Sequence, residues 1–348
     1  MSLPIVSPQA DLLLPLPQPG ERWASHLVHT HYFGFSIPEA ALGAFIYIRY
    51  QPAFPLCQGG VCIFSGLDNV NLMDIDFLDY QNTMPWPQAE PDGPIETANG
   101  LRITYPELGR HAQVSYQSRD GATNFKIDQR AISPLLARGH VVPGEDTDAD
   151  PSQEPGGFEQ YMRCTGSLTL HGETHPIDCF APRDRSWRQI RAERQGGSVA
   201  MPGVGWSPMC FGEDLSWSQV SIEAPSGHPL WLGHFDVPAG RPAHTFAWIC
   251  VDGETRAITD VRRKVHQHHP RLYSATRQTV EADDESGVTH RFEGTAIAAA
   301  ALPAWPNATF RDHVYRWEAE DGRVSHGTYQ ELWFDPYHSV IRRHLTAA

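Results

Sequence analysis

Several features that define common classes of protein are missing from this sequence of 348 residues. No apolar run reaches the roughly 18 to 20 residues that a membrane-spanning helix needs. The first twenty residues have no basic segment, and prolines at positions 15, 17 and 19 interrupt their apolar stretch, which argues against a signal peptide. We therefore expect a cytoplasmic protein that has no membrane span.

Paired cysteines are also missing. The six cysteines are scattered and form no C-x-x-C pair; they are Cys57, Cys62, Cys164, Cys179, Cys210 and Cys250. Their spacing indicates neither a zinc site nor a disulfide framework. Reduced thiols are expected, as in other cytoplasmic proteins, and no metal site is predicted.

Positive charge is scarce. The formal net charge is −14, and a broadly acidic surface repels the phosphate backbones of nucleic acids. The one short basic cluster, Arg262–Lys264, is interpreted as part of a solvated loop. Nucleic acid is therefore excluded as a partner.

Common catalytic signatures are absent as well. The chain has no G-x-G-x-x-G after a predicted strand, no P-loop, no G-x-S-x-G and no H-E-x-x-H. No nucleotide or other cofactor is therefore expected. Any chemistry must come from ordinary side chains.

Short apolar segments between turn residues are abundant. Many alternate between apolar and polar residues over four to eight positions, which is typical of strands; examples are residues 44–51, 100–105, 112–118, 166–172, 244–253 and 327–334. Their spacing suits antiparallel meanders, and the length favours two domains. Periodicity alone leaves open whether the sheets form barrels or sandwiches. Residues 143–157 are acidic and rich in Pro and Gly, which is typical of a linker.

One central motif is more specific. Residues 158–191 contain an E-Q-x-x-R-x-x-G pattern followed by R-D-x-S-W, and the matching residues are Glu159, Gln160, Arg163, Gly166, Gly172, Arg183, Asp184, Ser186 and Trp187. The C-terminal pattern Gly327-x-x-x-Glu331 adds to it. This combination resembles the carotenoid hydratase (hydroxyneurosporene synthase) and AttH-like lipocalin superfamily, which includes many bacterial members of unknown function.

The resemblance implies an all-β fold with two lipocalin-like (calycin-type) antiparallel β-barrels packed together. By analogy, the N-terminal barrel spans residues 1–178 and the C-terminal barrel residues 179–348, although the linker suggests an earlier division. The resemblance also implies a hydratase, dehydratase or isomerase that needs no cofactor. Its substrate would be a small hydrophobic molecule such as a terpenoid, steroid or polyketide.

The motif supplies the candidate catalytic residues. Asp184 and Glu159 are candidates for acid–base catalysis and Tyr161 for proton relay. Trp187 would form a wall of the site, and Arg185 would anchor a substrate oxygen. Structural roles compete with these assignments: an Arg–Asp pair joining the two barrels with Trp187 as a core residue, and a solvent-facing strand for Glu159 and Tyr161.

Three further residues are predicted to contact substrate. His31 belongs to a His-x-His pair with His29, which a strand would place on one side as pocket lining or, alternatively, as metal ligands. Asp76, with Asp74, would lie on one face of a strand over residues 71–80, looking either into an apolar interior or to solvent. Trp217 is one of several tryptophans that could line a pocket or simply fill the core.

Arg185 stands where the family pattern has His. Because arginine stays protonated, it cannot act as a general acid or base. This difference favours a second hypothesis, a lipocalin-like protein that binds a hydrophobic small molecule without changing it. A third is a structural or interaction module whose interiors are filled. The predicted partner is a hydrophobic small molecule, and a homodimer is one possible assembly.

Overall fold

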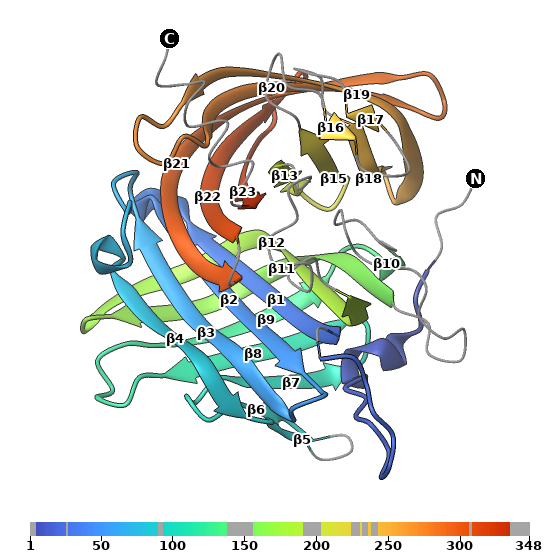
Figure 1. The fold of residues 1–348 in the computed structure, drawn as a ribbon. Coiled ribbons are helices and arrows are strands. Elements are labelled where there is room, and N and C mark those ends of the chain that lie inside the picture. Colours follow the sequence, from blue (N-terminus) through green and yellow to red (C-terminus); the bar gives the residue numbers. More distant parts are fainter. Residues whose placement is uncertain are drawn as a thin grey trace.

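The computed structural model describes residues 5–25, 27–89, 93–137, 156–190, 203–223, 230–231, 236–237, 243–305 and 308–334. Nearly all of this chain is β-structure, arranged as two large curled antiparallel sheets that lie against each other (Figure 1). This confirms the predicted fold class of two lipocalin-like barrels. Three short 3-10 turns complete it: η1 (Pro8–Leu12), η2 (Pro38–Ala40) and η3 (Leu72–Asp74).

The first sheet contains the strands of the N-terminal half. They are β1 (Leu27–Ile37), β2 (Leu42–Gln51), β3 (Leu56–Ser65), β4 (Phe77–Pro85), β5 (Gln88–Ala89), β6 (Ile95–Glu96), β7 (Arg102–Glu107), β8 (His111–Gln117), β9 (Asn124–Ala131), β10 (Leu136–Ala137), β11 (Gly156–Leu170) and β12 (Glu173–Ile190). Their order is β4-β3-β2-β1-β12-β11-β9-β8-β7-β6-β5, with β10 beside β11. The first strand therefore pairs with the last.

The second sheet contains most of the later strands. They are β13 (Gly203–Trp206), β14 (Met209–Cys210), β15 (Leu215–Glu223), β18 (Ala243–Val251), β19 (Glu254–His268), β20 (Ala275–Asp284), β21 (Thr289–Trp305), β22 (Ala308–Ala319) and β23 (Val324–Phe334). A separate small pair is formed by β16 (Leu230–Trp231) and β17 (Asp236–Val237). Because β13 pairs with both β15 and β23, the second sheet returns on itself and forms a closed barrel, which leaves only β14 outside the ring.

The first sheet closes differently. Its terminal strands β4 and β5 are not paired with each other among the described residues, and side chains bridge the seam instead. The Tyr116 hydroxyl of β8 donates to Asp79 Oδ2 of β4 at 2.6 Å, and Asn99 Nδ2 donates to the Asp79 carbonyl at 3.3 Å. A cavity of about 850 Å³ lies along this seam.

Alternation along β1 shows how the sequence builds two buried faces from one strand. Phe33 and Phe35 point into the first barrel, while Tyr32, which precedes Phe33, belongs to the cluster that joins the two barrels. All residues of β1 are buried, because one face covers the barrel interior and the other is covered by the second sheet. The strand therefore buries polar residues such as His29, Thr30 and His31 together with its apolar ones.

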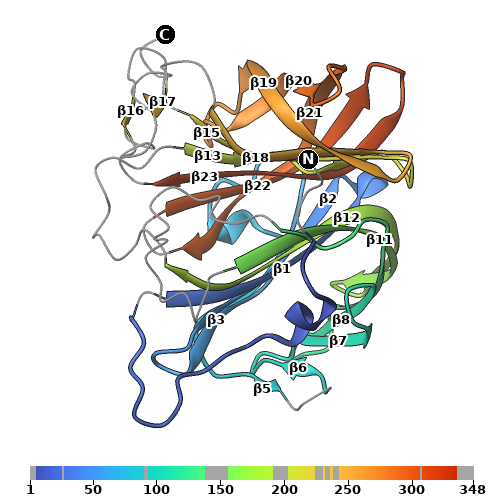
Figure 2. The ribbon, with the colours of Figure 1, turned by 90° about the vertical axis from the view of Figure 1, so that its right-hand side faces the viewer.

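The two barrels interlock closely. An apolar cluster unites Phe45 and Phe64 of the first sheet with Phe310 and Val314 of the second. A Cβ atom on Gly43 would come within 2.6 Å of Val314 Cγ2, so only glycine allows this approach. Figure 2 shows β22 and β23 lying over β1 and β12.

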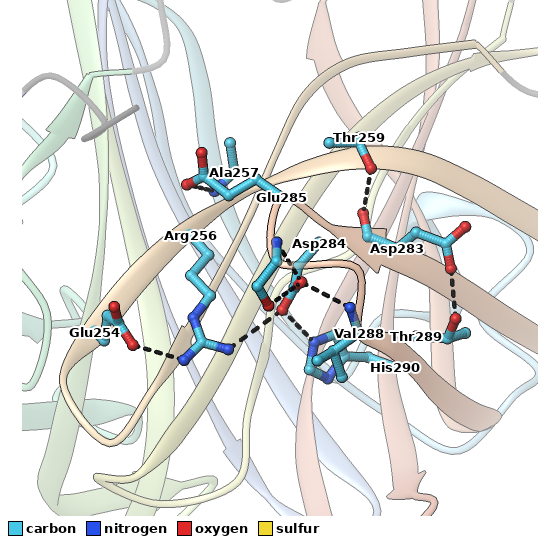
Figure 3. A network of polar contacts seen from close by, with 11 residues as sticks. Glu254, Arg256, Ala257, Thr259, Asp283, Asp284, Glu285, Val288, Thr289 and His290 are labelled. Carbon is cyan, nitrogen blue, oxygen red and sulfur yellow. Dashed lines mark hydrogen bonds and ion pairs between the residues drawn. The ribbon is translucent and has the colours of Figure 1, made fainter.

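Charged side chains fix the outer turns of the second barrel. Asp284, at the end of β20, accepts hydrogen bonds from the backbone N–H groups of Ser286 and Val288 and from His290 Nε2 (Figure 3). Arg256 of β19 lies 3.4 Å from the same carboxylate. Burial opposes ionisation, but the hydrogen bonds of His290 and Ser286 hold the pKa of Asp284 well below its usual range. This network is structural, because it ties a hairpin to its neighbouring strand.

Two sequence predictions can be compared with these elements. The predicted strand over residues 71–80 is wrong in its first half: Asp74 lies in η3 and is exposed, and only from Phe77 does the chain form β4. An Asn71–Asp74 capping box favours the turn. The predicted boundary after residue 178 falls inside β12, whereas the change of sheet occurs between β12 and β13. Most of the predicted linker lies outside the described residues.

Candidate active site between the two barrels

A row of polar residues crosses the first sheet on the face that the second barrel covers. Strand pairing places Glu159 of β11 directly opposite Asp184 of β12, and Asp184 directly opposite Tyr32 of β1. Tyr32 is in turn opposite Tyr47 of β2. We call these four residues, together with Tyr80 at the far end, the carboxyl–tyrosine row. Directly opposed residues have Cβ atoms about 5 Å apart, so the two carboxyl groups are neighbours.

The row is largely shielded from water. Glu159 is 1% exposed and Tyr32 3% exposed, whereas Asp184 is only half-buried. The Tyr32 hydroxyl lies 3.1 Å from Thr328 Oγ1 of β23, so the row contacts the second barrel directly. Gly34 makes this possible, because a Cβ atom there would lie 2.6 Å from the Tyr32 hydroxyl.

The second barrel contributes a carboxyl group of its own. Asp312 of β22 is 2% exposed and lies opposite Gln330 of β23. Burial raises the pKa of Asp312 well above its usual range, although Gln330 and the His313 N–H oppose the shift. The shift favours the protonated carboxylic acid, which is the form that can donate a proton.

Tyr32 lies between carboxyl groups of both barrels. Burial raises the pKa of Tyr32 well above its ordinary value, and the neighbouring carboxyl groups of Asp312 and Asp184 add to the rise. Its hydroxyl thus stays protonated and lies within electrostatic reach of both acids. Aromatic rings surround it: the rings of Trp206 and Phe45 have their centroids 5.4 and 5.5 Å from that of Tyr32.

A cationic side chain occupies the adjacent row. Arg49 of β2 is 3% exposed and lies opposite Thr30 of β1 and Gln58 of β3. The hydroxyls of Thr30 and Ser186 in this second row are 2.6 Å apart. The site therefore combines carboxyl, hydroxyl and guanidinium groups between apolar walls, which suits acid–base chemistry on an apolar molecule.

Of the three predicted catalytic residues, two lie in the row and one lies next to it. Asp184 and Glu159 face each other, as described. Tyr161 is on the same face of β11, but its hydroxyl donates to the backbone carbonyl of Trp217, and its ring packs edge-on against Trp248 at 5.4 Å. Tyr161 therefore links β11 to the second barrel.

Arg185 and His31 lie on the opposite face of the sheet, inside the first barrel. Arg185 Nε donates to the Ala10 carbonyl at 2.9 Å and its Nη1 to the Thr30 carbonyl at 3.2 Å. His31 Nδ1 lies 2.8 Å from the Tyr50 hydroxyl and 3.4 Å from Arg185 Nη1. Burial and then the charge of Arg185 hold the pKa of His31 well below its ordinary value, so this ring is neutral.

The remaining predicted residues are dispersed. Trp187 packs against Gly156, Ala10 and Phe158 at one end of the first barrel. Asp76 precedes β4, and its backbone carbonyl lies 2.7 Å from His171 Nε2 at the tip of the β11–β12 hairpin. Trp217 is fully buried in the core of the second barrel. None of the three belongs to the carboxyl–tyrosine row.

The Arg–Asp pair of the motif does not form as the structural alternative expected. Arg183 pairs with Asp11 inside the first barrel, with Nη1 2.6 Å from Oδ1, and Asp184 points the other way. Gln160 adds to this pair by accepting from Arg183 Nε at 2.7 Å. The motif thus serves both faces of β12, with arginines inside the barrel and Asp184 between the barrels.

Sequence reasoning missed Asp312 and the role of Tyr32. A signal was present: residues 183–187 read R-D-R-S-W and residues 311–315 read R-D-H-V-Y. In both strands the aspartate faces the opposite barrel and its neighbours point inward.

Among the described residues no group of three or more His, Cys, Asp or Glu is arranged to hold a metal ion. The described helices include none long and apolar enough to cross a membrane.

Solved structures share this fold at low sequence identity. Kievitone hydratase from Nectria haematococca matches with a TM-score of 0.53 and 12% identity, over 97% of this chain and 95% of that chain. CghA, solved with Sch210972, matches with a TM-score of 0.53 and 11% identity, over 91% of this chain and 90% of that chain. An AttH candidate from Nitrosomonas europaea gives 0.49 and 12%, over 92% and 99%. The predicted resemblance to the AttH and carotenoid hydratase group is confirmed as a fold.

Sequence comparison gives a narrower result. No curated protein matches the chain. Residues 19–334 match the model of a family described as a domain of unknown function, DUF7064. Because this match spans most of the sequence, the chain belongs to the DUF7064 family.

Proposed function

We propose that this protein is a hydratase-type enzyme that adds water to, or removes it from, a small hydrophobic molecule without a cofactor. The observation that supports this most strongly is the meeting of carboxyl groups from both barrels around Tyr32. Asp312 is a buried acid whose pKa is raised, and Asp184 is half-buried on the opposite sheet. An acid and a base on opposite sides of a bound molecule are what hydration requires.

The proposed reaction uses each group once. The Asp312 carboxyl gives its proton to one carbon of a carbon–carbon double bond, and a water molecule forms a C–O bond to the other carbon. Asp184 takes a proton from that water. The Tyr32 hydroxyl then accepts this proton from Asp184 and gives its own proton to Asp312, so that both acids return to their starting states. The sum is the addition of H and OH across the double bond, and the reverse sequence is dehydration.

The surroundings support an apolar substrate. The rings of Trp206 and Phe45 pack against Tyr32, and Phe310 packs against Phe45. Aromatic rings can stabilise a developing carbocation. Glu159 beside Asp184 would keep negative charge close to that cation. A terpenoid, steroid or polyketide alkene fits these requirements.

The test is a mass-spectrometric screen with the purified protein. Isoprenoid, steroid and polyketide alkenes are incubated in ¹⁸O-labelled water, and a product heavier by one labelled water is sought. Asp184→Asn, Asp312→Asn and Tyr32→Phe should each lower the rate about 10²- to 10⁴-fold. Asp178→Asn is the control, since Asp178 is an exposed residue of β12. Full activity in both Asp184→Asn and Asp312→Asn would contradict the proposed roles.

A second candidate function is carriage of such a molecule without chemistry. Arg185 favours it, because the residue at the motif's histidine position is engaged with backbone carbonyls inside the first barrel. Native mass spectrometry of the purified protein distinguishes the two. A co-purified molecule that stays unchanged through long incubation would support carriage over hydration.

A further inference from the structure

The closed second barrel holds a carboxylate with one unsatisfied oxygen. Glu331 of β23 is 5% exposed. Its Oε1 accepts hydrogen bonds from the Tyr329 hydroxyl at 2.6 Å and the Ala275 N–H at 3.3 Å, and lies 3.0 Å from Arg263 Nη2. Its Oε2 is buried and has no hydrogen-bond partner within the described structure. A buried carboxylate oxygen without a donor is costly.

Donors without acceptors share the same interior. Gln278 accepts a hydrogen bond from Arg263 Nε through its Oε1, but its Nε2 has no acceptor among the described residues. The indole N–H groups of Trp217 and Trp317 are likewise buried and without acceptors in this part of the chain. Both tryptophans are 0% exposed and belong to the core of this barrel. Native structures leave few such groups, and each one calls for an explanation.

The interior also accepts a larger side chain at one position. Gly327 is buried on the same side of β23 as Tyr329 and Glu331, opposite Tyr315 of β22. A Cβ atom built on Gly327 would meet nothing nearer than the Pro208 carbonyl oxygen, at 3.8 Å. By contrast, a Cβ atom on Gly294 would lie 2.3 Å from the Trp317 ring. Closed barrels of this size either fill their interior with side chains or hold one small ligand.

We propose that the interior of the second barrel is a separate binding site for a planar, hydroxylated aromatic molecule. The ligand's hydroxyl would donate to Glu331 Oε2. A carbonyl or ether oxygen on the same molecule would accept from Gln278 Nε2 or from an indole N–H. The rings of Tyr315, Trp317 and Phe292 would stack against its faces. This site lies on the opposite side of β22 and β23 from the carboxyl–tyrosine row and does not depend on the proposed hydratase activity.

The first experiment compares two matched compounds, 2-naphthol and 2-methoxynaphthalene. They differ in whether the oxygen carries a proton, so only 2-naphthol can donate to Glu331 Oε2. Binding is followed by quenching of tryptophan fluorescence and by calorimetry on the full chain. We expect 2-naphthol to bind at a single saturable site and at least about tenfold more tightly than the ether, since one hydrogen bond to a charged group contributes about 1.5–3 kcal/mol.

Variants then locate the site. Gly327→Leu should fill the open space and weaken 2-naphthol binding about tenfold or more, while the melting temperature stays equal or rises, because strands disfavour glycine. Glu331→Gln should abolish the preference for 2-naphthol over its ether. Asp184→Asn, which changes the face between the barrels, should bind 2-naphthol like the parent protein.

Three results would overturn the proposal. One is the absence of saturable binding to the parent protein. Another is equal affinity for the two compounds, which would mean that only a water-filled void surrounds Glu331. The third is 2-naphthol binding that survives Gly327→Leu but is lost in Asp184→Asn, which would place the molecule between the barrels.

Discussion

Each barrel contains a buried carboxylate paired with an arginine, but the two carboxylates are not equally satisfied. In the first barrel, Asp11 receives two hydrogen bonds from Arg183, at 2.6 and 3.2 Å, and one from the Gly109 N–H at 2.7 Å. Both of its oxygens are occupied. In the second barrel, three donors meet one oxygen of Glu331, and no donor among the described residues meets the other.

The difference follows from where the carboxylates come from. Asp11 belongs to the N-terminal segment, outside the strands, and is brought to the mouth of the first barrel by η1. The chain itself thus supplies the partner of Arg183; Figure 2 shows this short blue helix below β1 and β12. Glu331 is fixed on a strand, and no described segment reaches its second oxygen. In the first barrel, the chain itself therefore supplies donors to both oxygens of the buried carboxylate. In the second barrel, we propose that a ligand supplies the missing donor.

The largest expected effect is the loss of the Asp11–Arg183 pair. Both side chains are almost fully buried, so Asp11→Ala leaves the guanidinium without its counter-ion. We expect the free energy of unfolding to fall by about 3–5 kcal/mol, measured by urea denaturation. Asp178→Ala removes the exposed partner of Arg163 and should cost at most about 1 kcal/mol. Similar losses in the two variants would refute the idea that the segment seals the barrel.

A smaller effect on stability is expected when glycine is replaced by valine, and it should differ between two positions. Gly43→Val should force the barrels apart at Val314 and lower the free energy of unfolding by about 1–3 kcal/mol. Gly327→Val places its Cβ no nearer than 3.8 Å to a neighbour, the Pro208 carbonyl oxygen, and should be neutral or slightly stabilising. Thermal melts of the two variants at equal concentration provide the measurement. If Gly327→Val were as damaging as Gly43→Val, the second barrel would be as tightly filled as the contact between barrels.

The smallest expected effect is a gain in stability, and it comes from Asp312→Asn. Because the pKa of Asp312 is raised by burial, folding keeps a proton that the unfolded chain loses above its ordinary pKa of about 4. Stability therefore decreases as pH rises above that value, and Asp312→Asn removes the penalty. We expect this variant to melt a few degrees higher than the parent at neutral pH, and the two to converge near pH 4.

A carboxylate of the first barrel provides the contrast. Burial acts to raise the pKa of Asp128, but hydrogen bonds from Gln113 and His111 hold it below its ordinary value. Asp128→Asn should therefore lower stability at neutral pH, and the difference should disappear in acid. Equal pH dependence of Asp312→Asn and Asp128→Asn would contradict the assignment of a neutral acid between the barrels.

The sequence predicted the fold through local patterns. Alternation in segments such as residues 112–118 and 327–334 gave β8 and β23, and the R-D-x-S-W motif indicated the family resemblance. The same alternation placed Asp184 on the face opposite Arg183 and Arg185, as the structure has it. These features depend on neighbours in sequence, which a strand arranges in a simple way.

Long-range features were not predictable in this way. Asp312 faces the first sheet because β22 and β23 pack across β2 and β1. The R-D-H-V-Y pattern of residues 311–315 places Asp312 on the opposite face from its neighbours, but it does not say which barrel covers that face. Asp74 was misplaced because a capping box with Asn71 competes with the strand pattern. His31 and Arg185 are paired across β1 and β12, and their place inside the first barrel depends on which face the second barrel covers.

The pairing of β1 with β12 has a consequence for biosynthesis. Thr30 and Ser186, whose hydroxyls touch across these strands, are 156 residues apart. While the ribosome is still translating the intervening segment, β1 emerges with a buried edge and no partner for it. Contacts so distant in sequence slow the closure of the sheet, and a waiting strand edge is prone to pair with other nascent chains. Expression at low temperature or with a chaperone should therefore raise the yield of correctly folded protein more than any change at the surface.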